Sequence, residues 1–155
     1  MNQIHRANVV IRRVGLNRID DLLALENSSF TTDRISRRNL RNLLRSPSAC
    51  CLGAYLGGQL VGSMVVLFRR NTRVARIYSI AVTPFVRNMG IGRKMVFKAE
   101  RAAKARGCDR LRLEVRLDNT TAIRLYERLG FEDAQLLPGY YEDGALGMVY
   151  RKRIG

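Results

Sequence analysis

The spacing of apolar and polar positions changes along the chain between a helical period and a strand period, and it predicts the order of the elements. A short apolar and basic strand is expected at 9–14, and an amphipathic helix at 18–26. A second helix should begin after Ser36, because serine caps helix N-termini, and end at Pro47. The segment 27–35 between the two helices is expected to form a lip over a pocket.

The middle of the chain has the pattern of an antiparallel meander of strands. Three apolar runs are separated by a Gly-Gly pair and by a polar Arg-Asn-Thr turn, and they lie at 51–56, 60–68 and 74–82. Such turn sequences favour hairpins, so consecutive runs should pair with each other. Pro84 is expected to end the third strand.

The second half of the chain should alternate between helices and strands. A helix is expected at 91–106, where apolar residues recur at helical spacing. The next run, 110–116, alternates between apolar and charged residues, so that Glu114 must lie on the charged face of a strand. A further helix, capped by Asp118 or Asn119, and two more strands should complete the chain.

Composition limits the class of protein. At 155 residues and 46% hydrophobic, the chain 1–155 should form a single domain. It has neither a signal-peptide core nor a run near the roughly 18 apolar residues of a membrane helix, so we expect a soluble, cytoplasmic protein. Three cysteines without a paired spacing make disulfides and a zinc site poor hypotheses. The only histidine, His5, leaves Cys–His catalysis with little support.

The net charge of +15 comes mainly from arginine, which accounts for 24 of the 28 basic residues. The arginines are scattered along the chain and form no basic tail. Two interpretations stay open: attraction to an acidic partner such as nucleic acid or a polyanionic cofactor, and an arginine-rich composition spread over a solvated surface.

A glycine-rich turn provides the first candidate for chemistry. The segment 87–92 lies between an apolar run and a long helical pattern, where several backbone N–H groups can converge on one anion such as a pyrophosphate. A Rossmann fingerprint would need a third glycine where Met95 stands, and a P-loop would need Ser or Thr after Lys94. A plain turn between a strand and a helix is the alternative.

Three motifs in order resemble the GNAT superfamily of N-acetyltransferases over 77–131. They are Arg-x-x-Gly-x-Gly at 87–92, Leu-Glu-Val-Arg at 113–116 followed by Asn119, and Leu-Tyr-Glu-Arg-Leu-Gly-Phe at 125–131. Within that superfamily the chain is most similar to ribosomal-protein-alanine and other protein N-terminal acetyltransferases. The resemblance implies an α/β (α+β) fold with one mixed, mostly antiparallel twisted sheet of about seven strands and about four helices.

The resemblance also implies a site for acetyl-CoA and needs no metal. Backbone groups of one strand would hold the pantetheine and the thioester, the glycine turn would hold the pyrophosphate, and Asn119 would touch the cofactor or serve only as a helix cap. The cofactor-binding residues would be Ile80, Ala81, Val82, Arg87, Asn88, Met89, Gly90, Ile91, Gly92, Arg93, Asn119 and Tyr126.

By the same resemblance, Glu114 would act as the base that deprotonates the amine, and Tyr126 as the acid that protonates the departing thiolate. Each residue has a structural alternative: Glu114 could form a salt bridge with Arg112 or Arg116, and Tyr126 could pack in the core.

For the acceptor, the resemblance implies contacts from Phe30, Tyr140 and Tyr141, and Glu142 with Asp143 could attract a cationic amine. The loop at 30–33 lacks the Pro-Trp pair usual in the ribosomal-protein enzymes. Three hypotheses therefore stay open: acetylation of a protein or peptide N-terminus, with ribosomal proteins as one candidate class; acetylation of a small amine; and a basic module that binds CoA and docks on RNA or a ribosome without turnover. The chain could act as a monomer or a homodimer.

Overall fold

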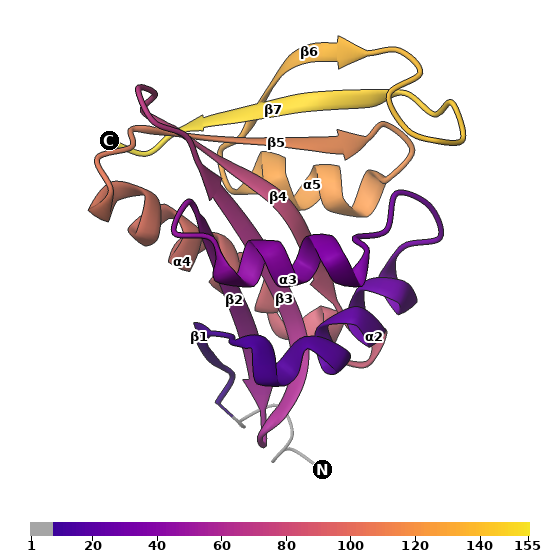
Figure 1. Cartoon of the computed structure of the whole chain (residues 1–155). Helices are drawn as coiled ribbons and strands as arrows, with labels where there is room; N and C mark the ends of the chain where they lie inside the picture. The colour runs from indigo at the N-terminus through magenta and orange to yellow at the C-terminus, as the bar shows by residue number, and fades with distance from the viewer. Residues whose placement is uncertain (1–7) are drawn as a thin grey trace.

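The computed structural model describes residues 8–155 and contains one seven-stranded sheet with the strand order β1-β2-β3-β4-β5-β7-β6 (Figure 1). Every strand pairing in it is antiparallel except that of β4 with β5. The strands are β1 (Val10–Arg13), β2 (Ala49–Leu56), β3 (Gln59–Phe68), β4 (Val74–Val82), β5 (Arg110–Arg116), β6 (Glu132–Leu137) and β7 (Gly147–Arg153). This is the predicted mixed, mostly antiparallel sheet.

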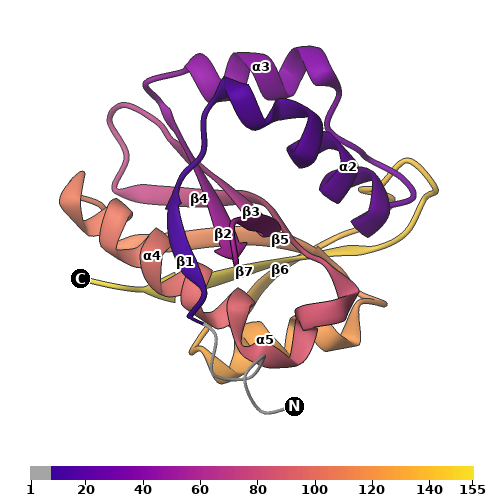
Figure 2. The ribbon, with the colours of Figure 1, turned by 90° about the horizontal axis from the view of Figure 1, so that it is seen from below.

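Helices cover both faces of the sheet, as the view from below shows (Figure 2). On one side lie α2 (Ile19–Ser29) and α3 (Arg37–Arg45), and on the other lie α4 (Ile91–Ala105) and α5 (Thr120–Arg128). Two 3₁₀ helices, η1 (Leu16–Arg18) and η2 (Pro84–Met89), precede α2 and α4. Among the helices of residues 8–155, none is long and apolar enough to cross a membrane.

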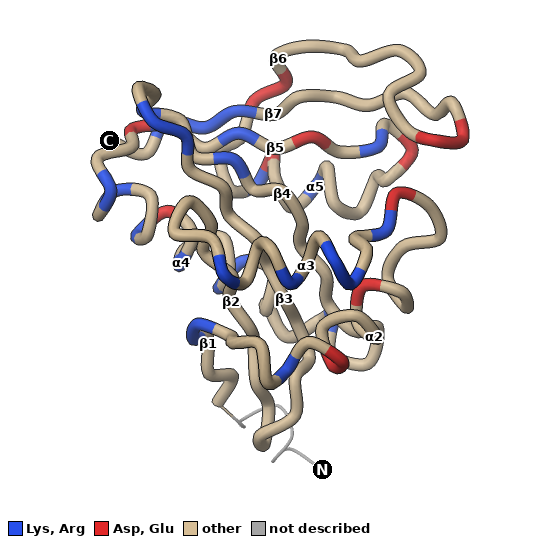
Figure 3. Tube along the Cα trace, viewed as in Figure 1, with Lys and Arg blue, Asp and Glu red and all other residues tan. Residues whose placement is uncertain are grey.

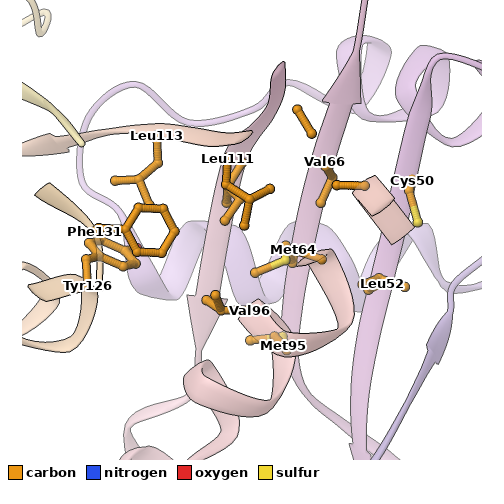
Figure 4. Close-up of a cluster of buried hydrophobic side chains, with 14 of the residues drawn as sticks. Cys50, Leu52, Met64, Val66, Met95, Val96, Leu111, Leu113, Tyr126 and Phe131 are labelled. Carbon is orange, nitrogen blue, oxygen red and sulfur yellow. The ribbon is translucent and has the colours of Figure 1, made fainter. Parts of the chain in front are cut away.

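The main hydrophobic core lies between the sheet and α4. The predicted stripe of α4, which consists of Ile91, Met95, Val96, Ala99 and Ala103, is fully buried. It packs against β3 and β5, and Tyr126 and Phe131 close one side of the same cluster (Figure 4). A smaller cluster lies beneath α2 and α3. All three cysteines are buried.

Local signals in the sequence located most element ends. The Ser36 hydroxyl caps α3 by accepting a hydrogen bond from the Asn39 N–H at 3.1 Å, and Asn119 caps α5. Several boundaries differ from the prediction by one to three residues, and two of them lie close to the candidate site. The first helix continues to Ser29 instead of ending at 26, and residues 87–89 of the predicted glycine turn belong to the 3₁₀ helix η2.

The parallel strands β4 and β5 pair only over the first part of their length. Their register ends at Ile77 opposite Leu113, although β4 continues to Val82 and β5 to Arg116. On its other edge, β4 has a bulge: Val66 pairs with Ile77 and Val65 with Ser79, so Tyr78 is the extra residue. Because a bulge bends and twists its strand, it gives a physical reason for β4 to leave β5 at this point. We call the opening between the two strands the β4–β5 fork.

Candidate active site at the β4–β5 fork

Glu114 lies on β5, one residue beyond the last β4–β5 pair, and its side chain is only 6% exposed. One carboxylate oxygen accepts a hydrogen bond from Arg76 Nε at 3.0 Å, and the other lies 3.0 Å from Arg112 Nη2. The predicted salt bridge with Arg112 is therefore confirmed. The alternative prediction, a salt bridge between Glu114 and Arg116, is wrong, because Arg116 pairs with Asp118 and Asp143 instead.

Tyr126 approaches the same region from α5, on the opposite face of the sheet. It is 4% exposed, belongs to the main core and stacks edge-on against Phe131, with ring centroids 5.7 Å apart. Burial raises the pKa of this phenol above its ordinary value, and nearby Tyr141 shifts the pKa in the same direction. The hydroxyl therefore stays protonated at neutral pH. Tyr126 thus packs in the core, as the structural alternative predicted. Core packing is compatible with a second role of its hydroxyl as a hydrogen-bond donor.

Tyr140 lies near Glu114, because its hydroxyl accepts a hydrogen bond from Arg76 Nη2 at 3.3 Å, and Tyr141 follows it in the chain. Their rings meet edge to face with centroids 5.0 Å apart, and they rest on β7 at Gly147, where a Cβ atom would come within 3.2 Å of Tyr141 and 3.3 Å of Tyr140. Burial raises the pKa of Tyr141 to about 12, and the neighbouring Tyr140 and the Glu114 carboxylate add to that rise. Tyr141 is thus electrostatically coupled to both Glu114 and Tyr126.

Two loops meet beside the tyrosine pair. The Asp33 N–H donates to Glu142 Oε2 at 3.4 Å, and the Glu142 N–H donates to the Asp33 carboxylate at 3.3 Å. Asp143 forms a bidentate pair with Arg116 at 2.7 and 3.1 Å, which lowers the pKa of Asp143. The prediction that Glu142 and Asp143 attract a cationic amine therefore needs correction: the main partner of Asp143 is Arg116, and Glu142 joins the two loops.

Phe30 ends α2 and is half-buried at the start of the first of these loops, where its N–H donates to the Glu26 carbonyl oxygen at 3.0 Å. The structure therefore brings Phe30, Tyr140 and Tyr141 to the same end of the sheet, since their two loops are in contact. The predicted lip starts at Phe30 rather than at Asn27, because α2 continues through Ser29.

The N-terminus of α4 has the features of an anion site. Its N-cap is Gly90 in the left-handed conformation (φ 71°), with no side-chain cap and no acidic residue in the first turn. The first N–H groups of this 15-residue helix therefore point out of it without a side-chain partner, beside the exposed Arg87 and Arg93. Gly92 allows close packing, because a Cβ there would lie 3.1 Å from Leu125 of α5.

The remaining predicted cofactor residues border the same opening. Ile80, Ala81 and Val82 form the end of β4 beyond its last pair with β5, so this edge of the strand has no β5 partner within the described chain. Asn88 is exposed and Met89 half-buried in η2, while Ile91, the first residue of α4, is fully buried. Asn119 Oδ1 accepts a hydrogen bond from the Ala122 N–H at 3.2 Å, which confirms its capping role.

Substituting Gly90 tests whether the start of α4 binds an anion, because the effect on ligand affinity can be compared with the effect on thermal stability. Gly90→Val forces a β-branched residue into the left-handed region, which costs about 1–2 kcal/mol, and it distorts the first N–H groups of α4. We expect lower thermal stability and at least about tenfold weaker binding of acetyl-CoA, because hydrogen bonds to charged groups are worth about 1.5–3 kcal/mol each. Calorimetric titration measures the affinity.

Gly107 is the matched control, because it has φ 83° at the other end of the same helix and an equally open surrounding. Gly107→Val should lower the melting temperature by a similar amount and leave the affinity unchanged. Equal affinities for both variants would exclude the N-terminus of α4 as the phosphate site.

Glu26 is a candidate that sequence reasoning missed. It lies on α2 with 5% of its surface exposed, and its Oε2 accepts a hydrogen bond from the Ser79 hydroxyl of β4 at 3.2 Å, next to Ile80. Burial raises the pKa of Glu26, although hydrogen bonds from Ser79 and from the Ile35 backbone partly oppose this shift. A signal was available: Glu26 stands four residues after Leu22, on the apolar stripe of the helix.

The raised pKa of Glu26 makes a prediction for stability. The native state holds the Glu26 proton more tightly than the unfolded state, so this residue reduces stability as the pH rises from 4.5, the ordinary pKa of a glutamate side chain, through the raised pKa. Glu26→Gln keeps the Ser79 partner without the charge. We expect the variant to be more stable than the wild type at pH 7, and the difference to vanish below about pH 4. Urea unfolding at several pH values measures both; a constant difference would contradict this account.

Comparisons with known proteins identify the family of the chain. Residues 16–131 match the model of the acetyltransferase (GNAT) family. An N-acetyltransferase of Methanocaldococcus jannaschii is 31% identical over 147 residues, which cover 93% of this chain and 92% of the relative. A Bacillus subtilis protein named as a candidate ribosomal-protein-bS18-alanine N-acetyltransferase is 29% identical over 138 residues, which cover 89% and 90%.

The fold agrees as well. The crystal structure of the ribosomal-protein-S18-alanine N-acetyltransferase from Escherichia coli superimposes with a TM-score of 0.85 at 22% identity, covering 96% of this chain and 95% of that one. The family model extends over both motifs that border the β4–β5 fork, the start of α4 and the strand of Glu114. The chain therefore belongs to the acetyltransferase (GNAT) family and is an N-acetyltransferase.

Proposed function

We propose that the protein transfers an acetyl group from acetyl-CoA to the N-terminal amine of a protein or peptide. The observation that carries this proposal is the β4–β5 fork, which has a carboxylate, Glu114, on one face of the sheet, a protonated phenol, Tyr126, on the other, and the uncapped start of α4 beside it. The similarity to the Bacillus subtilis relative named for ribosomal-protein-alanine acetylation supports a protein acceptor.

The residues of the chain fit the two ends of acetyl-CoA. The N–H groups at the start of α4, with Arg87 and Arg93 beside them, would hold the pyrophosphate. The unpaired backbone edge at 80–82 would pair with the amide groups of the pantetheine arm, as a neighbouring strand would. Acetyl-CoA supplies an activated thioester at this position. The protein would orient its carbonyl group between the two faces of the fork.

The transfer requires one proton to leave the amine and one to reach the sulfur. The amine nitrogen attacks the thioester carbonyl carbon, the C–N bond forms and the C–S bond breaks. Glu114 would take the proton that the ammonium group loses, since its two oxygens offer roughly four acceptor sites and the two arginines use only part of them. Tyr126 would donate a hydrogen bond to the sulfur, which departs as a thiolate and takes its proton from water.

A panel of acceptors tests the proposed function. Purified protein is incubated with acetyl-CoA and with peptides that differ only in their first residue, alongside polyamines and peptides that offer only a lysine amine. We expect acetylation of the peptide α-amine, located by fragment mass spectrometry, and no product from peptides whose N-terminus is blocked. Acetylation confined to lysine side chains or polyamines would contradict the assignment of the acceptor.

A further inference from the structure

An arginine-lined groove continues from Glu114 along the open face of the sheet. It has a volume of about 700 Å³ and ends at Glu114 and Tyr140. Five arginines line it, and Glu114 is the only carboxylate among its lining residues. They are Arg69, Arg76, Arg110, Arg112 and Arg151. Figure 3 shows the basic residues of β4, β5 and β7 on this side and acidic residues at the loops around Asp33 and Glu142. Charge is thus segregated along the sheet.

The strand register places three of these arginines side by side. Arg76 pairs with Arg112 across β4 and β5, and Arg112 pairs with Arg151 across β5 and β7. Paired residues on adjacent strands lie about 4.5–5.5 Å apart at their Cβ atoms, and like charges placed this way destabilise a sheet. Glu114 offsets part of that repulsion because it pairs with Arg76 and Arg112, and a further anion beside Arg112 and Arg151 would offset the rest. The row therefore favours a negatively charged occupant.

Few carboxylates of the chain balance this charge. Glu114 pairs with Arg76 and Arg112, but within residues 8–155 no carboxylate lies within 4.0 Å of Arg69, Arg110 or Arg151. The Nε atom of Arg112 is also buried without a hydrogen-bond partner in the described part of the chain. The groove thus offers several donors to a ligand.

Building on the function proposed above, we propose that the acetyl acceptor is an acidic peptide segment: its α-amine lies at Glu114, and the carboxylates of its next residues bind the arginines of the groove. On β5, Arg112 and Arg110 lie two and four residues before Glu114, which corresponds to about 7 and 13 Å at 3.3 Å per residue. An extended peptide has the same rise. Acidic side chains at its second to fourth positions would therefore reach the arginines.

The shape of the groove favours a peptide over RNA. Its walls include the apolar Leu67, Phe68 and Val74, and its volume is that of a ligand pocket, which holds a few residues. Its inner end is the carboxylate proposed to receive the amine proton. The two loops that carry Asp33 and Glu142 are joined by hydrogen bonds. The groove provides an open approach to Glu114 beside them.

Three peptides with the same first residue and with Glu, Gln or Lys at positions two to four test the inference. We expect kcat/KM to be at least about tenfold higher for the Glu peptide than for the Gln peptide, and the ratio to shrink with added salt. In the double variant Arg110→Gln/Arg151→Gln, the ratio of kcat/KM for the Glu peptide to that for the Gln peptide should fall towards one. The control Arg38→Gln/Arg41→Gln, on the exposed face of α3, should keep it, and melting temperatures check that both variants fold.

A binding measurement separates this inference from the proposed function. Fluorescence anisotropy of the same peptides, labelled at the C-terminus, reports occupancy of the groove without turnover. A Glu preference in binding with no acetylation would refute the function and support the groove. Equal binding and equal kcat/KM for Glu and Gln peptides would overturn the inference and leave N-terminal acetylation intact. We expect that a single-stranded RNA does not displace the labelled peptide. RNA binding that depends on the groove arginines, together with no preference for the Glu peptide, would also overturn the inference.

Discussion

Replacing Glu114 by glutamine is expected to lower kcat for peptide acetylation by about 10²–10⁴, the usual contribution of a positioned base. Glutamine keeps the size of the side chain, and its carbonyl oxygen can still accept a hydrogen bond from Arg76 or Arg112, but it cannot take a proton. Because the amine must then lose its proton to solvent, the remaining rate should continue to rise with pH where the wild-type rate levels off. Rates of CoA thiol release, measured over a range of pH, give both the decrease in kcat and the change in its pH profile.

Glu132 provides the matched control for this variant. It is an exposed carboxylate on β6, outside the fork, and Glu132→Gln should leave the rate and its pH profile unchanged. If Glu114→Gln stayed within about twofold of the wild type, Glu114 would have only the structural role of pairing the two arginines, because a catalytic base contributes far more.

Replacing Tyr126 by phenylalanine is the second large expected effect, a loss of about 100-fold in kcat. Burial raises the pKa of this phenol well above that of a thiol, about 8.5 when unperturbed, so complete transfer of its proton to the thiolate is unfavourable. A hydrogen bond to the sulfur is therefore the main help that Tyr126 can give. The decrease in kcat of Tyr126→Phe should be greatest with acetyl-CoA as the donor and smaller with an acyl donor whose leaving group is less basic.

Tyr55→Phe controls for the loss of a buried phenol. Tyr55 lies on β2, is 6% exposed and is remote from the fork, so its variant should retain full kcat. Melting temperatures of both variants should stay close to that of the wild type, since the ring of Tyr126 and its contact with Phe131 remain. A Tyr126→Phe enzyme with wild-type kcat would reduce this residue to core packing.

Features encoded by neighbouring residues could be predicted from the sequence. The stripe of α4, the caps Ser36 and Asn119 and the alternation around Glu114 depend on spacing within one element, and the structure confirms each of them. The resemblance to a known family implied a mixed sheet of about seven strands, but the order of the strands was not predicted, because no local pattern specifies that β7 lies between β5 and β6.

Features that depend on strand register could not be predicted. Arg76 reaches Glu114 from 38 residues away, and the row of Arg76, Arg112 and Arg151 forms only when three strands align. The bulge at Tyr78 similarly requires knowledge of the opposite strand. A scattered set of arginines in the sequence thus becomes a localised groove in the fold. Glu26 is different, because its place on the apolar stripe of α2 is a local signal of burial, although a carboxylate is seldom buried.

The central claim is that the start of α4 binds the pyrophosphate of acetyl-CoA and so brings the acetyl group to the fork. Calorimetric titration with acetyl-CoA, acetyl-dephospho-CoA and acetyl-pantetheine tests it directly, because only the last lacks the pyrophosphate. We predict similar affinities for the first two and at least about tenfold weaker binding of the third, given about 1.5–3 kcal/mol for each hydrogen bond to a charged group. Equal affinities for all three ligands, or no binding of acetyl-CoA, would contradict the account.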